Sequence, residues 1–171
     1  LINNAHLIIL AVGMTFVIVT GGIDLSLGTG MTLASVMTGV FIVNMGMPVW
    51  LGVIGGVATG ALMGLINGVN VAILKLPPFI ATLAMMMIAQ GLALIISGVR
   101  PIYFSGVAPN FKDIALGTLI PGLPNAVLIT IVLAVVAYLV LSKTILGRYT
   151  FAIGSNEEAT RLSGVNTRRW K

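Results

Sequence analysis

Long apolar segments occupy most of this sequence and restrict its fold more than any other feature. They run over residues 5–20, 27–46, 50–74, 79–97 and 125–142. A helix needs about 20 predominantly apolar residues to cross the roughly 30 Å hydrocarbon core of a bilayer. Hydrophobic residues make up 58% of the chain and charged residues 8%, which is more apolar surface than a soluble domain can cover. The sequence therefore predicts an all-α polytopic membrane protein with about five transmembrane segments.

A polar, glycine-rich break separates the first two apolar segments. From Thr20 to Gly28 the chain reads Thr-Gly-Gly-Ile-Asp-Leu-Ser-Leu-Gly, which places a carboxylate, two hydroxyls and three glycines between them. Either two spans turn tightly at a membrane surface, or the break lies inside the bilayer and faces a cavity, as in transporters with discontinuous helices. The break holds no Lys or Arg that would anchor it at an interface, and this favours a discontinuous pair. The candidate residues of a translocation path are Thr20, Gly21, Gly22, Asp24, Ser26 and Gly28.

Two roles are open for Asp24 and Ser26. Their oxygens can cap the helix that follows the break, by accepting N–H bonds from its first turn. Ionisable side chains within membrane segments otherwise turn inward to a cavity or a partner, and they often mark a transport pathway. The residues alone do not decide between capping or local bracing on one side and lining a path on the other.

Glycine recurs at every fourth residue of the third apolar segment. Four residues advance a helix by about 400°, so the stripe drifts by about 40° per step and stays on one flank. Such a stripe lets the backbone of another helix approach closely. Asn67 and Asn70 follow near its end on one side, where interhelical hydrogen bonding or a pathway role is expected. The candidate packing residues are Gly52, Gly56, Gly60, Gly64, Gly68 and Asn67.

Basic residues gather after the fifth apolar segment. Six of the nine lie between 143 and 171. Because cytoplasmic segments of membrane proteins carry an excess of Lys and Arg, residues 143–171 are expected in the cytoplasm and the proline-rich connection at 98–124 outside. The net charge of +5 is therefore interpreted as orientation in the membrane rather than as nucleic-acid binding.

A polar segment within this tail has the pattern of a short helix with defined ends. Ser155 and Glu158 have the spacing of a capping box. Gly164 stands where a helix-terminating glycine belongs. The sequence predicts a short helix at 155–164.

Three motifs, in family order, resemble the bacterial ABC permeases that import ribose, xylose, galactose and related small solutes. They are Gly21–Gly28, the Pro77–Leu83 string after Asn67-Gly68, and the Asn-Glu-x-Ala-x-x-x-Ser-Gly pattern of Asn156–Gly164. The resemblance covers nearly the whole chain. The departures from the usual family residues are Leu27 for Val, Gln90 for Arg, Ser155 for Gly and Thr160 for Ala.

The resemblance implies a transporter subunit rather than an enzyme, with no cofactor. Its expected partners are a separate ATPase, a second permease copy in a homodimer, a periplasmic or extracellular sugar-binding protein, and membrane lipid. The cargo would be a monosaccharide or a related small polar solute. The segment at 155–164 would be the coupling helix that docks on the ATPase. Its expected contact residues are Asn156, Glu157, Glu158, Ala159, Arg161, Leu162 and Gly164.

The same resemblance implies a multi-pass protein of the bacterial inner membrane. Residues 1–171 would be a fragment of a single permease transmembrane domain, because the chain opens at Leu1 without Met and closes at Lys171 within a basic run.

Other kinds of chemistry find little support in the sequence. It has no Walker A pattern, no cysteine and a single histidine, His6, so neither ATP binding of that type nor a metal site is predicted. The alternative function is an autonomous secondary transporter or channel that uses Asp24 as an ion site. Such a protein has no need of an ATPase-docking helix, so the segment at 157–164 discriminates between the two.

Overall fold

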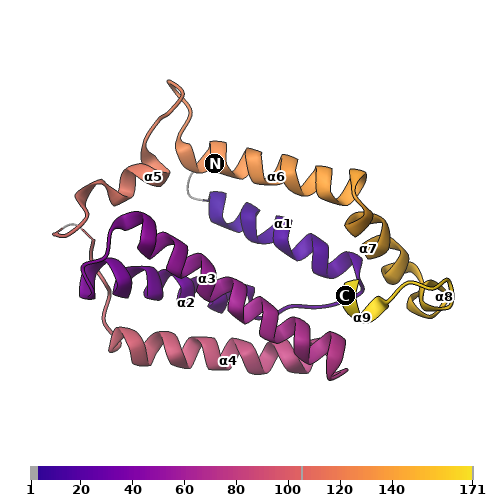
Figure 1. The fold of residues 1–171 in the computed structure, drawn as a ribbon. Coiled ribbons are helices and arrows are strands. Elements are labelled where there is room, and N and C mark those ends of the chain that lie inside the picture. The colour runs from indigo at the N-terminus through magenta and orange to yellow at the C-terminus, as the bar shows by residue number, and fades with distance from the viewer. Residues whose placement is uncertain (1–3, 105, 171) are drawn as a thin grey trace. The chain divides into compact units, whose positions relative to one another are not determined.

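The computed structural model describes residues 4–104 and 106–170, and this part of the chain is helical without named strands (Figure 1). The all-α prediction is confirmed. Leu1 and Lys171, on which the expectation of a fragment rested, lie outside the described residues. The chain forms two compact units, one of Leu1–Ile23 with Asp113–Lys171 and the other of Asp24–Lys112.

The unit Asp24–Lys112 consists mainly of three long helices. These are α2 (Leu27–Gly39), α3 (Val49–Gly68) and α4 (Pro78–Ser97), and α2 packs against both of the others. A short 3₁₀ turn, η4 (Pro109–Lys112), ends the unit. The buried apolar cluster between the three helices consists of Leu33, Met63, Met85, Ala89 and Ala93.

The ends of α2 and α3 are built alike. Each helix widens into a π-helical turn, η2 (Val40–Asn44) after α2 and η3 (Val69–Ile73) after α3. Two residues beyond each turn the backbone has positive φ, 66° at Gly46 and 58° at Lys75. A proline then precedes or opens the next helix, where its fixed φ is compatible with a helix start. Both connections can therefore be short, and α2, α3 and α4 run in alternating directions (Figure 1).

The second unit pairs α1 (Ala5–Val19) with α6 (Asn125–Lys143), which lie side by side in Figure 1. Three shorter helices follow at the C-terminal end. They are α7 (Ile145–Ser155), α8 (Glu157–Leu162) and α9 (Thr167–Trp170). The small helix α5 (Asp113–Leu116) precedes α6 and contacts it.

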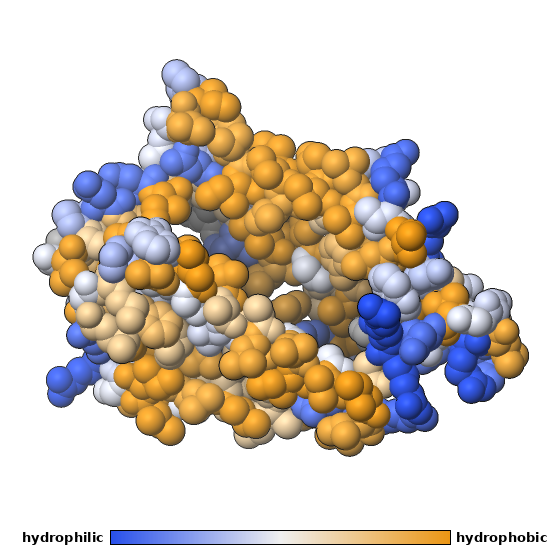
Figure 2. Space-filling model, viewed as in Figure 1, coloured by the Kyte–Doolittle hydropathy of each residue, from blue (hydrophilic) through white to orange (hydrophobic). Residues whose placement is uncertain are grey.

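Within the described residues, four helical stretches are long and apolar enough to cross a membrane: Leu27–Asn44, Val49–Ile73, Pro78–Ser97 and Asn125–Lys143. The helix α1 is apolar too, but its 15 residues reach only about 22 Å at 1.5 Å per residue. Figure 2 shows apolar side chains over the visible face of α6 and hydrophilic ones gathered over α7 to α9. The structure thus supports a polytopic membrane protein in which four of the five predicted segments reach full spanning length.

Candidate functional site

The polar break starts as a helix terminator. The N–H of Gly21 donates to the carbonyl of Ile18 at 2.9 Å, and the N–H of Gly22 donates to that of Val17 at 3.0 Å. This is the bonding pattern of a Schellman motif, and Gly21 takes the left-handed φ of +77° that the motif needs. The hydroxyl of Thr20 also donates to Val17 at 2.8 Å. The first part of the break therefore satisfies the carbonyls at the end of α1 from its own residues.

The second part of the break forms a polar network with α3. The carboxylate Oδ1 of Asp24 accepts hydrogen bonds from the N–H of Ser26 at 2.8 Å and from its hydroxyl at 2.7 Å. The side-chain Nδ2 of Asn67 donates to the Ser26 Oγ at 2.9 Å. Ser26 and Asn67 are 4% and 6% exposed, so this contact is enclosed by protein. The network ties the start of α2 to α3, although 41 residues separate Ser26 and Asn67.

Asp24 braces the break locally rather than capping the first turn of α2. Ser26 occupies the position before α2, and its side chain makes no capping bond to that helix. Asp24 instead bonds Ser26 itself, in the Asx-type local turn that short carboxylates favour. The reason is that Asp24 lies two residues ahead of the cap position, and Ser26 directs its hydroxyl to Asp24 while receiving Asn67.

One polar atom of the network has no partner. The Oδ1 of Asn67 is buried and accepts no hydrogen bond within the described residues. A buried acceptor left unsatisfied costs about 1–3 kcal/mol. The position of Asn67 near the end of the glycine stripe predicts interhelical hydrogen bonding or a pathway role, but its partner Ser26 becomes evident only when α2 and α3 are placed together. Of the other predicted path residues, Gly28 is exposed, and an added Cβ there would meet no atom within 4 Å.

The glycine stripe of α3 is divided into a packed part and an open part. A Cβ added at Gly52 would overlap Ile42, and one added at Gly56 would overlap the Thr38 hydroxyl and lie 2.9 Å from the carbonyl oxygen of Ala34. Both glycines are buried against the α2–η2 segment. The remaining three have no atom within 4 Å of an added Cβ, and their predicted role in helix packing stays a prediction: Gly60, Gly64 and Gly68.

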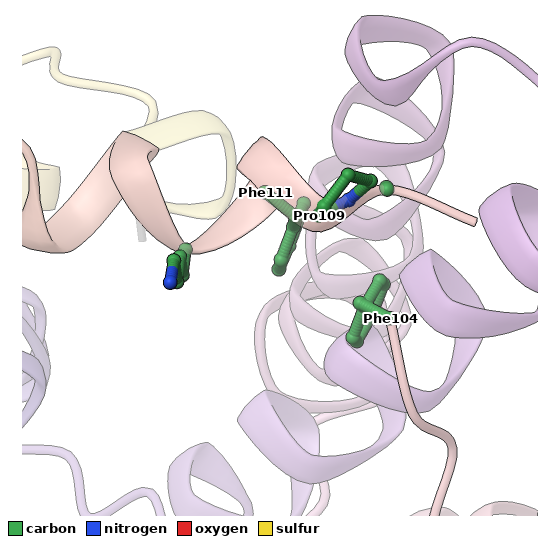
Figure 3. Close-up of a pocket in the computed structure, with 5 residues that line it drawn as sticks. Phe104, Pro109 and Phe111 are labelled. Carbon is green, nitrogen blue, oxygen red and sulfur yellow. The ribbon is translucent and has the colours of Figure 1, made fainter. Parts of the chain in front are cut away.

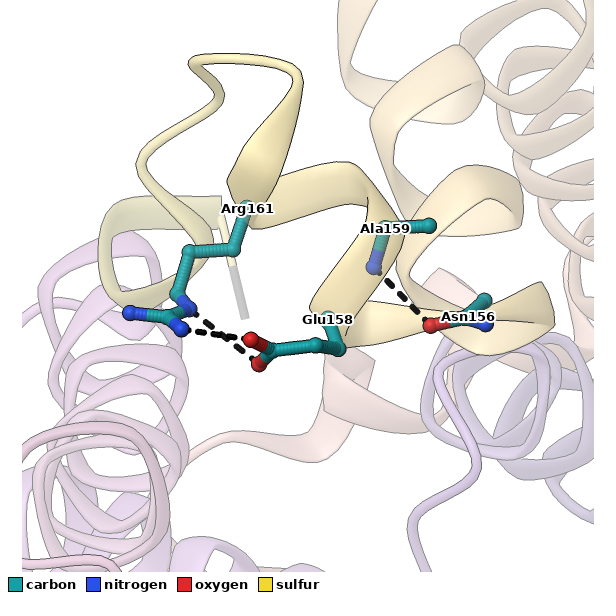
Figure 4. Close-up of polar contacts among 4 residues, drawn as sticks. All are labelled: Asn156, Glu158, Ala159 and Arg161. Carbon is teal, nitrogen blue, oxygen red and sulfur yellow. Dashed lines mark hydrogen bonds and ion pairs between the residues drawn. The ribbon is translucent and has the colours of Figure 1, made fainter.

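The predicted helix in the C-terminal tail is present as α8, with a different cap. Asn156, not Ser155, precedes the helix, and its Oδ1 accepts the N–H of Ala159 at 2.9 Å (Figure 4). The predicted capping box is therefore wrong, because Ser155 is the last residue of α7. Gly164 has a φ of +86° and donates to the carbonyl of Arg161 at 3.1 Å, so its predicted role as the terminating glycine is confirmed.

The exposed surface of α8 combines an apolar edge with an ion pair. Ala159 and Leu162 are exposed, and they lie three residues apart, on one side of the helix. Glu158 pairs with Arg161 (Figure 4), and this hydrogen bond, with the attraction between the charges, holds the pKa of Glu158 below its usual value. The pair is complete at neutral pH and is lost as the pH falls through the lowered pKa. Both side chains are exposed, so the pair fixes local geometry more than it stabilises the fold.

A small cavity lies in the connection after α4 (Figure 3). It has a volume of about 320 Å³, and its walls include Phe104 and Phe111, whose rings are stacked with centroids 4.2 Å apart. Ala108, Pro109 and Lys112 complete the lining. None of the path, packing or coupling residues predicted from the sequence lines this cavity.

The chain matches one family of known proteins over its whole length. Residues 1–171 match the family described as branched-chain amino acid transport system / permease component. The chain is 39% identical over 165 residues to the galactofuranose transporter permease protein YtfT of Escherichia coli (strain K12), covering 96% of this chain and 47% of that protein. It is 39% identical over 165 residues to the ribose import permease protein RbsC of Haemophilus influenzae, covering 95% of this chain and 50% of that protein.

A third relative extends the range of named sugars. The fructose import permease protein FruF of Bifidobacterium longum is 36% identical over 169 residues, covering 98% of this chain and 47% of that protein. No solved structure matches the chain. The chain spans about half the length of the curated relatives it matches. With a match over its whole length and helices that suit a membrane, this chain belongs to the ABC transporter permease family that includes the bacterial monosaccharide importers.

Proposed function

We propose that this chain is part of the permease of an ABC importer that conducts a monosaccharide or related small polar solute and is driven by a separate ATPase. The relatives named above are permeases for galactofuranose, ribose and fructose, which supports a sugar as the cargo. A second permease copy and a sugar-binding protein outside the membrane complete the proposed assembly. The tail at 143–171 would lie in the cytoplasm and the connection at 98–124 on the opposite side of the inner membrane.

The form of helix α8 favours this proposal over an autonomous transporter. It is short, capped by Asn156, ended by Gly164, and presents Ala159 and Leu162 to solvent. A helix that only fixed orientation would need basic residues but no cap and no exposed apolar edge. We therefore assign α8 as the coupling helix, whose apolar edge enters a groove of the ATPase while Glu157, Glu158 and Arg161 set its register.

Ala159→Asp tests this assignment in the full-length permease expressed with its ATPase and binding protein. The substitution puts an unpaired charge on the contact edge but leaves the Asn156 cap and the basic residues in place. We expect normal membrane insertion, loss of the ATPase on purification, and loss of ATP-driven uptake. Asn166→Asp is the matched control, because it adds the same charge to an exposed residue beyond α8. Retention of both the ATPase and uptake in Ala159→Asp would refute the coupling role.

The break would supply part of the solute path. In this proposal Thr20, Gly21, Gly22 and Gly28 shape the backbone, Asp24 offers a carboxylate oxygen to a hydroxylated solute, and Ser26 holds that carboxylate in place. Asp24→Asn tests the carboxylate, because it keeps an oxygen that can accept the Ser26 bonds while removing the charge. We expect the permease to assemble normally and uptake to fall. Unchanged uptake would show that the charge has no essential role.

Two single cysteines test the proposed orientation, since the chain has none of its own. Lys112→Cys and Arg168→Cys should react with a membrane-impermeant thiol reagent from opposite sides of the membrane. Labelling of both from one side would contradict the topology.

A further inference from the structure

A backbone contact joins α7 to the end of α1. Both helices belong to the unit formed by Leu1–Ile23 and Asp113–Lys171. A Cβ added at Gly154, next to the last residue of α7, would overlap the carbonyl oxygen of Val19 and lie 3.5 Å from the Cα of Thr20. Val19 is the last residue of α1, and Thr20 is the first residue of the polar break. Gly154 therefore contacts the residues at which the proposed solute path begins.

The close approach, not backbone freedom, is what requires glycine at this position. Gly154 is helical and is not among the residues with positive φ. Side chains between two helices can absorb a small displacement by changing rotamer, but two backbones in contact cannot. A displacement of α7 along this contact must therefore move the end of α1 or break the contact.

Asn156 joins α7 to α8 with bonds in both directions. Its N–H donates to the carbonyl of Ala152 in α7 at 3.0 Å, and its Oδ1 accepts the N–H of Ala159 in α8. Its carbonyl oxygen accepts the N–H of Thr160 at 3.0 Å and the hydroxyl of Thr160 at 2.8 Å. Thr160 is buried and Asn156 is exposed, so the hydroxyl bond is partly shielded from water. With a single residue between the two helices and four bonds to that residue, α7 and α8 form a stiff elbow.

The helix α9 also contacts α7 and α8. Tyr149 of α7 meets Trp170 of α9 edge to face, with ring centroids 5.1 Å apart. The N–H of Val165 also reaches back to the carbonyl of Thr160 at 3.4 Å. With these contacts, a displacement of α8 would displace α7 rather than only bend the turn between them.

We infer that Gly154 is a positioning residue for transport, which transmits movement of α8 to the start of the Thr20–Gly28 break. The inference rests on the proposed role of α8 as the coupling helix and extends it by naming the next step of the route. The bonds that would respond first are those of the α1 terminator, from Gly21 to Ile18 and from Gly22 to Val17. Their rearrangement would change the backbone of the break without any solute or ATPase touching it.

Gly154→Ala is the direct test, made in the full-length permease with its ATPase and binding protein in proteoliposomes. We expect the ATPase to stay bound and ATP to be hydrolysed, while the solute transported per ATP falls at least about fivefold, the lower end of typical coupling between sites. Gly13→Ala is the matched control, because the same change in α1 meets no atom within 4 Å and should leave the ratio as in the wild type. A wild-type ratio in Gly154→Ala would overturn the inference.

A measurement on the unmodified complex covers the case in which Gly154→Ala fails to assemble. Amide hydrogen exchange at Gly21 and Gly22 should differ between the nucleotide-free and ATP-bound complexes, while mid-helix amides around Gly13 should not. In Ala159→Asp this difference should disappear with the loss of the ATPase. Equal exchange rates at Gly21 and Gly22 with and without nucleotide would overturn the inference. This holds even if Ala159→Asp loses the ATPase and ATP-driven uptake as proposed.

Discussion

The two ends of the contact between α2 and α3 use glycine in opposite ways. At one end the glycines belong to α3, and Gly52 and Gly56 receive Ile42 and Thr38 from the α2–η2 segment. Further along, the glycine belongs to α2. A Cβ added at Gly30 would lie 3.3 Å from the Cε of Met63 in α3. The contact then closes on the hydrogen bond between Asn67 and Ser26. Close packing therefore continues along α3 beyond the point where its own glycines face α2.

The helix period explains the change. At 100° per residue, the buried residues Gly52, Gly56, Met63 and Asn67 fall within about 60° around α3. A strict four-residue repeat drifts by about 40° each step, so the fifth glycine lies about 160° from the first. Gly64 and Gly68 are accordingly exposed. A glycine stripe of this length can serve one neighbouring helix only over its first part.

Gly56→Leu attacks the packed end and should have the largest effect on stability. The new side chain would have to displace the Thr38 hydroxyl and the backbone at Ala34, which lies 2.9 Å from the first added carbon. Overpacking of this kind costs about 1–3 kcal/mol, and backbone obstruction puts Gly56 at the upper end. Thermal unfolding of the detergent-solubilised permease, compared with Gly91→Leu at an open position of α4, measures the loss. Equal melting temperatures of Gly56→Leu and Gly91→Leu would show that α2 does not pack closely against Gly56.

Ser26→Ala attacks the polar end and should have an intermediate effect. Removing the hydroxyl leaves the Nδ2 of Asn67 without its partner, next to an Oδ1 that already has none. An unsatisfied buried group costs about 1–3 kcal/mol, and the smaller side chain adds little to that. The double variant Ser26→Ala with Asn67→Leu should recover most of the loss, because both polar partners are then replaced. If the double variant stays as unstable as Ser26→Ala, the hydrogen bond between Asn67 and Ser26 does not stabilise this end of the contact.

Sequence patterns sufficed for the helices but not for their contacts. Length and hydropathy located all five apolar segments, and Gly164 could be assigned as a terminator because its pattern is local. The pairing of Ser26 with Asn67, or of Gly30 with Met63, depends on how α2 and α3 are aligned, which no local pattern contains. The choice of Asn156 over Ser155 as a cap depends on where α7 ends, and helix ends are the least determined part of a pattern.

Gly60→Leu probes the open part of the stripe and should have the smallest effect on the fold of this chain. No atom lies within 4 Å of an added Cβ, so the new side chain meets no obstruction within the described residues. Replacing glycine inside a helix also removes a conformational cost of about 0.5–1 kcal/mol. We therefore expect a melting temperature equal to or slightly above that of the wild type, against the clear loss in Gly56→Leu. A loss matching that of Gly56→Leu would mean that a helix outside this chain packs on Gly60, and it would restore the packing role that the four-residue repeat predicted for the whole stripe.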